Sequence, residues 1–350
     1  MSISTVAKLA GVSTSTVSRV INNHPRVALE TERSVRKAMQ ELGYTPSDRR
    51  PGPKSAGRLK TEKKRAAFLV LGASGEQATP AFAGLLRGVS LGGADNGIDV
   101  AFHFVPDPNE ISAWILEQRI DGLLLHGALP SGEIERRLRK IPTVWLMGNR
   151  RRPDWGDQVM PDSYEIGHLA AEYLTSRGHT RLAFLNLDAG FWPFRLYCQS
   201  FTAAAADQSV PVVAVEHPLG ELPDYWHRHS QKVVADLVDR FMAITPRPTG
   251  IFVADDMQVA VIQPALQAAG VQIGQGHTQI ISCNNEAPFR VGLSPKPAAI
   301  DIRVESIGWR GVEQLLWRMA HLHLQERIIC AVEPVVIDVE VPTQPTLPQT

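Results

Sequence analysis

The chain has 350 residues, of which 44% are hydrophobic and 21% charged, and this suits two or three domains with ordinary cores. No basic-then-apolar segment opens the chain, and no apolar run approaches the roughly 20 residues that span a membrane. We therefore expect neither export nor membrane contact. Three widely spaced cysteines without a Cys-x-x-Cys motif are typical of reduced thiols in a cytoplasmic protein.

Three short helical patterns fill the first 46 residues. Gly11 permits a tight turn after the first pattern, and Ser13 is suited to cap a second helix that runs to about Asn22. A third helix is predicted from about Glu30 to Leu42. The first pattern consists of apolar residues at helical spacing, which are Ile3, Val6, Ala7, Leu9 and Ala10. This arrangement indicates a helix-turn-helix.

The second helix has the chemistry of a DNA-recognition helix. Val17, Val20 and Ile21 form its predicted buried face. A long donor such as Arg19 can pair with guanine in the major groove, whereas short polar side chains and helix N-terminal amides can hold phosphates. The residues predicted to face DNA are Ser13, Thr14, Ser15, Ser18, Arg19 and Asn22. The alternative is a small helical bundle that binds no nucleic acid.

Charge divides the chain into a basic head and an acidic body. Residues 1–65 hold 14 Lys and Arg against 5 Asp and Glu, whereas residues 66–350 hold 22 against 31. A basic head supplies the salt-dependent attraction to phosphate that DNA binding needs. We therefore expect operator DNA as a partner and an association with the nucleoid.

Residues 47–65 are the predicted linker or hinge. Pro51 and Pro53 prevent a regular helix there. One interpretation is a solvated linker. The other is a second DNA contact, in which the basic segment lies along a minor groove and Leu59 inserts between base steps. The basic residues of this second interpretation are Arg49, Arg50 and Lys54.

From residue 66 onward, apolar runs alternate with helical patterns, which predicts parallel sheets covered on both faces. This length favours two doubly wound lobes, with a break near Pro161 and a ligand cleft at the carboxyl ends of the strands. Strands are predicted at 66–72, 98–105, 121–127, 143–148, 181–187, 212–217, 250–256 and 278–284. Helices are predicted at 81–95, 108–118, 131–139, 164–177, 194–206, 227–243 and 257–269.

Several side chains are candidates for the cleft. Asp255 and Asp256 end a predicted strand; we assign Asp255 to the ligand and Asp256 to the cap of the following helix. Aromatic faces stack on sugars but also simply pack. Both interpretations stay open for Phe82, Trp192 within the cluster 191–194, Tyr225 and Trp226.

Signals for catalysis are missing from the sequence. We find no phosphate-binding glycine loop, no nucleophile elbow and no His/Cys metal spacing. His321 and His323, expected on a helix, are two residues apart and do not share a face. We predict a protein that is not an enzyme and has no cofactor and no metal.

Residues 2–46, and above all VAKLAGVSTSTVSRVINN, closely resemble the headpiece of the lactose-repressor/galactose-repressor (LacI/GalR) family of bacterial transcription regulators. The body resembles the family's periplasmic-binding-protein-like effector domain. The segments that carry this second resemblance are RIDGLLL, SRGHTRLAFL, FVADDMQVAVIQPALQAAGV, TQIISCNN and AAIDIRVESIG. The resemblance implies a dimeric or tetrameric repressor whose operator affinity is set by a small molecule, usually a sugar, sugar derivative or nucleoside.

The resemblance also assigns roles in the headpiece. It places the base-reading positions on Thr14, Ser15 and Arg19, and family contacts to phosphates and grooves near Asn22, His24 and Arg26. The family's hinge-helix pattern is interrupted here by extra residues after Tyr44. This insertion moves Leu59 to the position of the family's intercalating leucine.

In the cleft, the resemblance maps a polar ring onto Asp162, Asp255 and Asn284, of which the last is usually aspartate. The family's ligand-clamping arginine falls on Tyr197, and Arg195 lies two residues earlier. Acceptor-rich groups without a placed arginine favour a neutral polyol. An inward-pointing Arg195 would favour a uronate or another acidic sugar instead.

We therefore predict a ligand-responsive, sequence-specific DNA-binding repressor of carbohydrate-related genes, with helix 81–95 in the dimer surface. The effector can act as inducer or as co-repressor. The alternatives are a transport-type binding protein and an enzyme on a doubly wound fold. The predicted parts are a headpiece (1–46), a linker (47–65), lobe 1 (about 66–160 and 291–320), lobe 2 (about 161–290 and 321–340) and a disordered tail (341–350).

Overall fold

The structure is a computed structural model in which the chain forms two compact units, Met1–Thr61 and Glu62–Thr350. The described residues are 3–21, 28–44, 63–72, 79–111, 120–148, 153–217 and 230–338.

The first unit contains the helices α1 (Ile3–Leu9), α2 (Thr14–Ile21) and α3 (Leu29–Glu41), as the sequence predicts. The turns that follow α1 and α3 use glycines in the left-handed region, Gly11 at φ +64° and Gly43 at φ +58°. Leu9, a member of the apolar pattern of α1, is 52% exposed. The three helices share a small core of Val6, Ala7, Val17, Val20, Val35 and Ala38.

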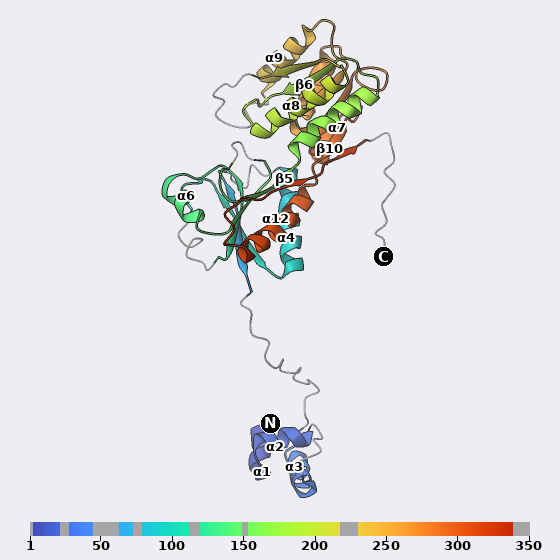
Figure 1. Cartoon of the computed structure of the whole chain (residues 1–350). Coiled ribbons are helices and arrows are strands. Elements are labelled where there is room, and N and C mark those ends of the chain that lie inside the picture. The colour runs from blue at the N-terminus through green and yellow to red at the C-terminus, as the bar shows by residue number, and fades with distance from the viewer. Residues whose placement is uncertain are drawn as a thin grey trace. The chain divides into compact units, whose positions relative to one another are not determined.

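The second unit begins with a six-stranded parallel sheet that forms lobe 1 (Figure 1). Its strand order is β11-β5-β4-β3-β1-β2, with β1 and β2 in register from Arg65 opposite Asp99. The strands are β1 (Arg65–Leu71), β2 (Asp99–Val105), β3 (Gly122–Gly127), β4 (Thr143–Leu146), β5 (Asp157–Pro161) and β11 (Ile329–Val332). The helices of this lobe are α4 (Pro80–Asn96), α6 (Gly132–Leu138) and α12 (Val304–Ala320).

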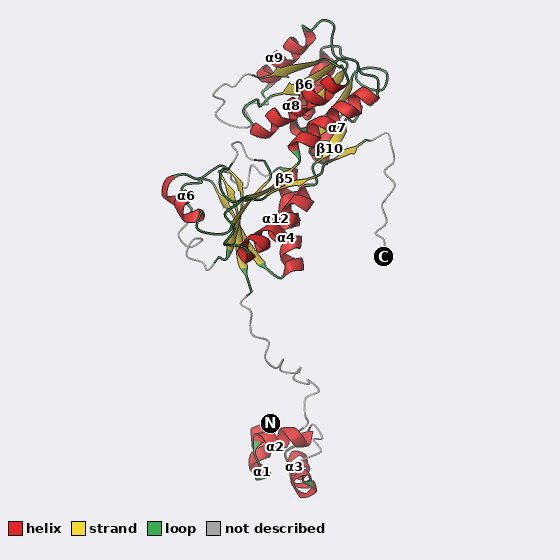
Figure 2. Ribbon diagram, viewed as in Figure 1, coloured by secondary structure: helices red, strands yellow, loops and turns green. Residues whose placement is uncertain are grey.

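Lobe 2 is built on a second six-stranded sheet (Figure 2), of order β12-β10-β9-β8-β6-β7. In this sheet β12 alone runs antiparallel to its neighbour. The strands are β6 (Leu182–Asn186), β7 (Val212–Glu216), β8 (Gly250–Val253), β9 (Gln279–Cys283), β10 (Ala298–Asp301) and β12 (Val335–Ile337). The helices are α7 (Ser163–Ser176), α8 (Trp192–Asp207), α9 (Gln231–Met242), α10 (Asp256–Ala268) and α11 (Ala287–Arg290). Two α/β lobes are therefore confirmed.

The lobe boundaries after residue 290 differ from those expected. β10 pairs with β9 and belongs to lobe 2, while β11 pairs with β5 and belongs to lobe 1. The chain thus passes between the lobes after β5, after β10 and between β11 and β12. β11 and β12 are partly exposed edge strands of only four and three residues, so their apolar runs are shorter than the runs that mark a buried strand.

The structure differs from the sequence-based expectation at β5 and at the end of α12 as well. β5 is fully buried, yet it begins with the polar residues Asp157 and Gln158, which interrupt its apolar pattern. α12 ends at Ala320, so His321 and His323 lie beyond the helix on which they were expected. Among the described residues, no helix is long and apolar enough to cross a membrane.

α4 and α12 lie side by side in lobe 1 (Figure 1). Their close approach depends on glycine, because a Cβ atom at Gly88 would lie 2.0 Å from Glu305 O and one at Gly308 would lie 2.3 Å from Leu85 O. α12 therefore fixes the position of α4, whose first turn contacts lobe 2 through Glu286.

Candidate functional site

α2 presents the predicted DNA-facing side chains. Thr14, Ser15 and Arg19 are exposed, and Ser18 is partly exposed. Val17 and Val20, on the opposite face, are buried in the three-helix core and hold the helix in place.

Ser13 precedes α2 and acts as its cap. Its hydroxyl accepts from the amide of Thr16 at 3.2 Å, and it also bonds the hydroxyls of Ser15 (2.7 Å) and Thr16 (2.9 Å). The remaining predicted DNA contacts, and two predicted cleft aromatics, lie outside the described residues. They are Asn22, His24, Arg26, Arg49, Arg50, Lys54, Leu59, Tyr225 and Trp226.

A cavity of about 220 Å³ lies between the two lobes, at the carboxyl ends of β3, β4, β6, β8 and β9. This is the edge at which doubly wound sheets bind ligands. Its lining residues are Thr79, Ala81, His126, Met147, Gly148, Pro161, Asp188, Phe191, Pro193, Phe194, Tyr197, Asp255, Asn284, Glu286 and Ile302.

Asp255 lies in the cavity wall, just after β8. Its side chain accepts from Gln258 N at 2.8 Å and thereby caps α10, while 5% of the residue stays exposed. Burial, together with the nearby charges of Glu286 and Asp256, raises its pKa from 3.8 to about 7. The cap is therefore Asp255, and not Asp256 as the sequence predicts, because β8 ends at Val253 and Asp255 is still extended.

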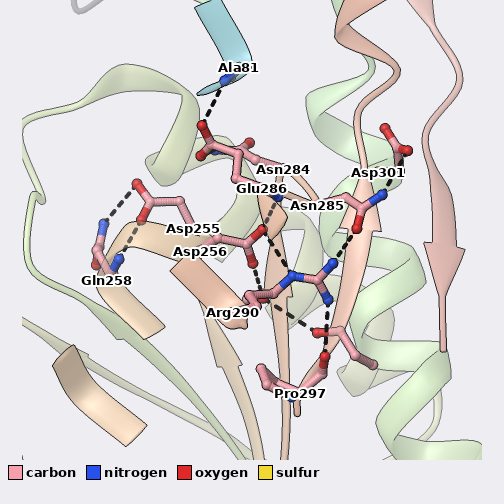
Figure 3. Close-up of polar contacts among 12 residues, drawn as sticks. Ala81, Asp255, Asp256, Gln258, Asn284, Asn285, Glu286, Arg290, Pro297 and Asp301 are labelled. Carbon is pink, nitrogen blue, oxygen red and sulfur yellow. Dashed lines mark hydrogen bonds and ion pairs between the residues drawn. The ribbon is translucent and has the colours of Figure 1, made fainter. Parts of the chain in front are cut away.

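Asn284 and Glu286 reach the cavity from the turn after β9 (Figure 3). Asn284 adopts φ +96°, a conformation that asparagine tolerates better than most residues. Glu286 is 6% exposed, and its Oε1 accepts from Ala81 N of lobe 1 at 2.8 Å. Burial raises the pKa of Glu286.

Asp256 lies behind this wall, completely buried, and organises the same turn (Figure 3). It accepts hydrogen bonds from Ser282 Oγ and Glu286 N, and its Oδ2 forms an ion pair with Arg290 Nε at 3.4 Å. Arg290, 2% exposed, also donates to Asn285 Oδ1 and to Pro297 O. A fully buried ion pair thus fixes the backbone that carries Glu286.

The cavity wall also contains aromatic side chains of lobe 2 and a histidine of lobe 1. Phe191 and Phe194 form an edge-to-face pair with centroids 4.8 Å apart, and Tyr197 lies 5.7 Å from Phe194. His126 Nδ1 lies 3.1 Å from Leu146 O, so this nitrogen carries the proton and donates. Burial lowers the pKa of His126, which keeps the ring neutral and leaves Nε2 as an acceptor.

Four predicted ligand residues lie outside the cavity wall. Phe82 packs in an aromatic cluster with Phe68, Phe102 and Phe104 in lobe 1. Asp162 caps α7 by accepting from Tyr164 N and Glu165 N at 3.1 Å each. Trp192 is half-buried and Arg195 is exposed at the start of α8. Their neighbours Phe191 and Phe194 line the cavity instead.

Tyr197, Asp255 and Asn284 are the predicted residues that the structure brings together. Sequence reasoning missed Glu286, His126 and Asp188. All three had a usable signal, since each lies at or just after the carboxyl end of a predicted strand.

The cavity wall is rich in hydrogen-bond acceptors. Asp188, Asp255 and Glu286 contribute carboxyl groups, and no Lys or Arg lines the wall in the part of the chain that the structure describes. Within that same part, no group of His, Cys, Asp and Glu side chains is arranged to hold a metal ion. The site therefore favours binding of a donor-rich molecule over an anion.

Comparisons with known proteins find matches in both units. The family model described as bacterial regulatory proteins, lacI family, matches residues 2–47, and that of a periplasmic binding protein-like domain matches residues 171–337. The ribose operon repressor of Escherichia coli (strain K12) is 27% identical over 92% of this chain and 94% of its own length. The HTH-type transcriptional repressor PurR of Mannheimia succiniciproducens is 26% identical over 91% and 92%.

Two solved structures share the fold. A complex of the transcriptional regulator CelR with cellobiose has a TM-score of 0.62 at 20% identity and covers 97% of this chain and 98% of that one. The lac repressor dimer bound to operator and an anti-inducer has a TM-score of 0.60 at 18% identity, with the same coverage.

Proposed function

We propose that the chain is a member of the lacI family of bacterial regulatory proteins, and that it represses transcription from a near-palindromic operator under control of a small polyol. Members of this family are DNA-binding regulators rather than enzymes. The observation that carries the proposal is α2, a helix anchored by its buried valines that exposes Thr14, Ser15 and Arg19 on a basic N-terminal unit.

We assign base reading to Thr14, Ser15 and Arg19. Arg19 combines reach with the bidentate geometry that suits guanine. Ser13 and Ser18, together with the amides at the start of α2, are assigned to phosphates. The same proposal gives Asn22, His24, Arg26 and the basic linker residues phosphate or groove contacts.

The effector is assigned to the interlobe cavity. Asp255, Glu286, Asn284 and the neutral His126 offer acceptors, which match the hydroxyl donors of a sugar. Phe191 and Phe194 can cover an apolar sugar face. This assignment agrees with the names of the relatives, one of which is a ribose operon repressor and another a regulator solved with cellobiose.

A homodimer completes the proposal. A single headpiece makes few base contacts, and a two-fold pair doubles them on a palindromic site. The lac repressor of similar fold was solved as a dimer on its operator. In this chain α4 has a 43% exposed leucine, Leu91, and small neighbours that permit close packing.

The effector assignment is tested by a thermal-shift screen of the full-length chain against pentoses, hexoses, disaccharides, sugar acids and nucleosides. A ligand present at about 100 times its dissociation constant adds about 2.7 kcal/mol of stability. Asp255→Ala is expected to abolish the shift and the ligand response while operator binding persists. If no compound raised the unfolding temperature of the wild type, or if a compound raised it equally in the wild type and in Asp255→Ala, the assignment would be contradicted.

A further inference from the structure

Glu286 is a cavity residue that belongs to lobe 2 and contacts lobe 1. Its Oε1 accepts from Ala81 N at 2.8 Å, and Ala81 is in the first turn of α4 (Figure 3). The first amides of a helix have no partner within the helix and need an acceptor from elsewhere. Thr79, the residue that caps α4, accepts from Phe82 N at a long 3.4 Å. Glu286 therefore supplies the stronger of these two contacts at the start of α4.

The contact also places negative charge at the positive end of a 17-residue helix. Glu286 is 6% exposed, so water screens this interaction little. The helix it contacts packs closely against α12 at Gly88 and Gly308 and is therefore part of the packed structure of lobe 1.

Lobe 2 holds Glu286 rigidly. Asp256 accepts from the Glu286 amide, and the buried Arg290 joins Asp256 to Asn285. Asn285 donates to Asp301 Oδ2 at 3.0 Å, at the end of β10 where the chain crosses to lobe 1. The turn that carries Glu286 is thus anchored both to Asp256 at the start of α10 and to Asp301, where the chain crosses between the lobes.

We propose that Glu286 couples the cavity to lobe 1: one carboxylate holds the N-terminus of α4 through Oε1 and offers Oε2 to a donor on the effector. Oε2 lies 3.4 Å from Asn284 Nδ2, a weak contact that leaves acceptor capacity for a ligand hydroxyl or amine. The effector contact rests on the proposed function, whereas the hold on α4 does not.

The coupling is tested by hydrogen exchange and mass spectrometry on the full-length chain without ligand. Glu286→Ala is expected to speed exchange in the first turn of α4 about fivefold, as loss of a helix cap does. Glu286→Gln keeps an acceptor oxygen and is expected to restore most of the slow exchange. Glu305→Gln, an exposed carboxylate on α12 that pairs with Arg87, is the matched control and should resemble the wild type.

Three results would overturn the role of Glu286. These are unchanged exchange at the start of α4 in Glu286→Ala, equally fast exchange in Glu286→Gln, or equal loosening of α10, which would indicate general damage to lobe 2. In the thermal-shift screen, Glu286→Gln is expected to raise the ligand concentration needed for a given shift at least tenfold. If the wild-type protein bound neither an operator nor a sugar, the proposed function would be refuted. The exchange result would still show whether Glu286 stabilises the N-terminus of α4.

Discussion

Replacing Asp255 by asparagine should stabilise the protein at neutral and alkaline pH. Burial holds the pKa of this carboxyl near 7 instead of 3.8, so the folded protein keeps a proton that the unfolded chain has released. Asparagine has nearly the same shape and retains an oxygen for the cap on Gln258 N. It removes the cost of a buried charge without removing the cap.

The sign and size follow from linkage between protonation and folding. The contribution of the raised pKa to stability is complete below about pH 4 and declines as the pH rises toward 7. The difference between the two pKa values corresponds to about 4 kcal/mol, at about 1.4 kcal/mol per pKa unit. Asp255→Asn cannot ionise at this position, so its stability should not show this decline. At pH 8 its free energy of unfolding should exceed that of the wild type by up to about 4 kcal/mol.

The measurement is urea unfolding followed by tryptophan fluorescence, at several pH values from 5 to 8. The free-energy difference between Asp255→Asn and the wild type should grow across this range and level off above pH 7. Asp162→Asn, which changes a half-exposed cap on α7, serves as control and should differ little from the wild type. Parallel pH profiles for Asp255→Asn and the wild type would refute the reasoning.

Arg19→Ala should cost about 1–3 kcal/mol at the operator and relax specificity at one base pair in a fluorescence-anisotropy titration; equal weakening on all sequences would make Arg19 a phosphate contact. Gly88→Ala should lower the free energy of unfolding of the second unit by about 1–3 kcal/mol in urea unfolding, because its Cβ would lie 2.0 Å from Glu305 O. A change below about 0.5 kcal/mol would show that α4 and α12 separate easily. Replacing the three basic linker residues by alanine should flatten the salt dependence of operator binding, with a slope smaller by up to about 0.9 for each phosphate that the variant no longer neutralises, and an unchanged slope would leave the segment a plain linker. Those residues are Arg49, Arg50 and Lys54.

Strong periodic patterns made most of the fold predictable. The strands that are buried on both faces, such as β1 and β8, appear in the sequence as continuous apolar runs. The three-helix unit was predictable because Gly11 and Gly43 mark the ends of helices whose apolar residues recur at helical spacing. β5 could not be found in this way because Asp157 is buried as the partner of Arg318 and Gln314, a contact from distant α12 that no local pattern reveals.

The site was predictable only in part. Asp255 and Asn284 follow predicted strands, so topology alone brings them to one edge. Trp192 lies in the loop after a predicted strand, and Asp162 was mapped by the resemblance, but neither lines the cavity. Asp162 caps α7, and Phe194 rather than Trp192 lines the cavity from the start of α8. Glu286 depends on the positive φ of Asn284 and Asn285, which redirects the chain toward lobe 1.

The most direct test of the central claim is selection of binding sites from a randomised duplex library by the full-length protein. We predict enrichment of one near-palindromic sequence, with half-sites about one helical turn apart. Arg19→Ala should enrich a site that is degenerate at one position in each half. No enrichment by the wild type, or the same site from both proteins, would contradict the assignment of α2 as the recognition helix of a sequence-specific regulator.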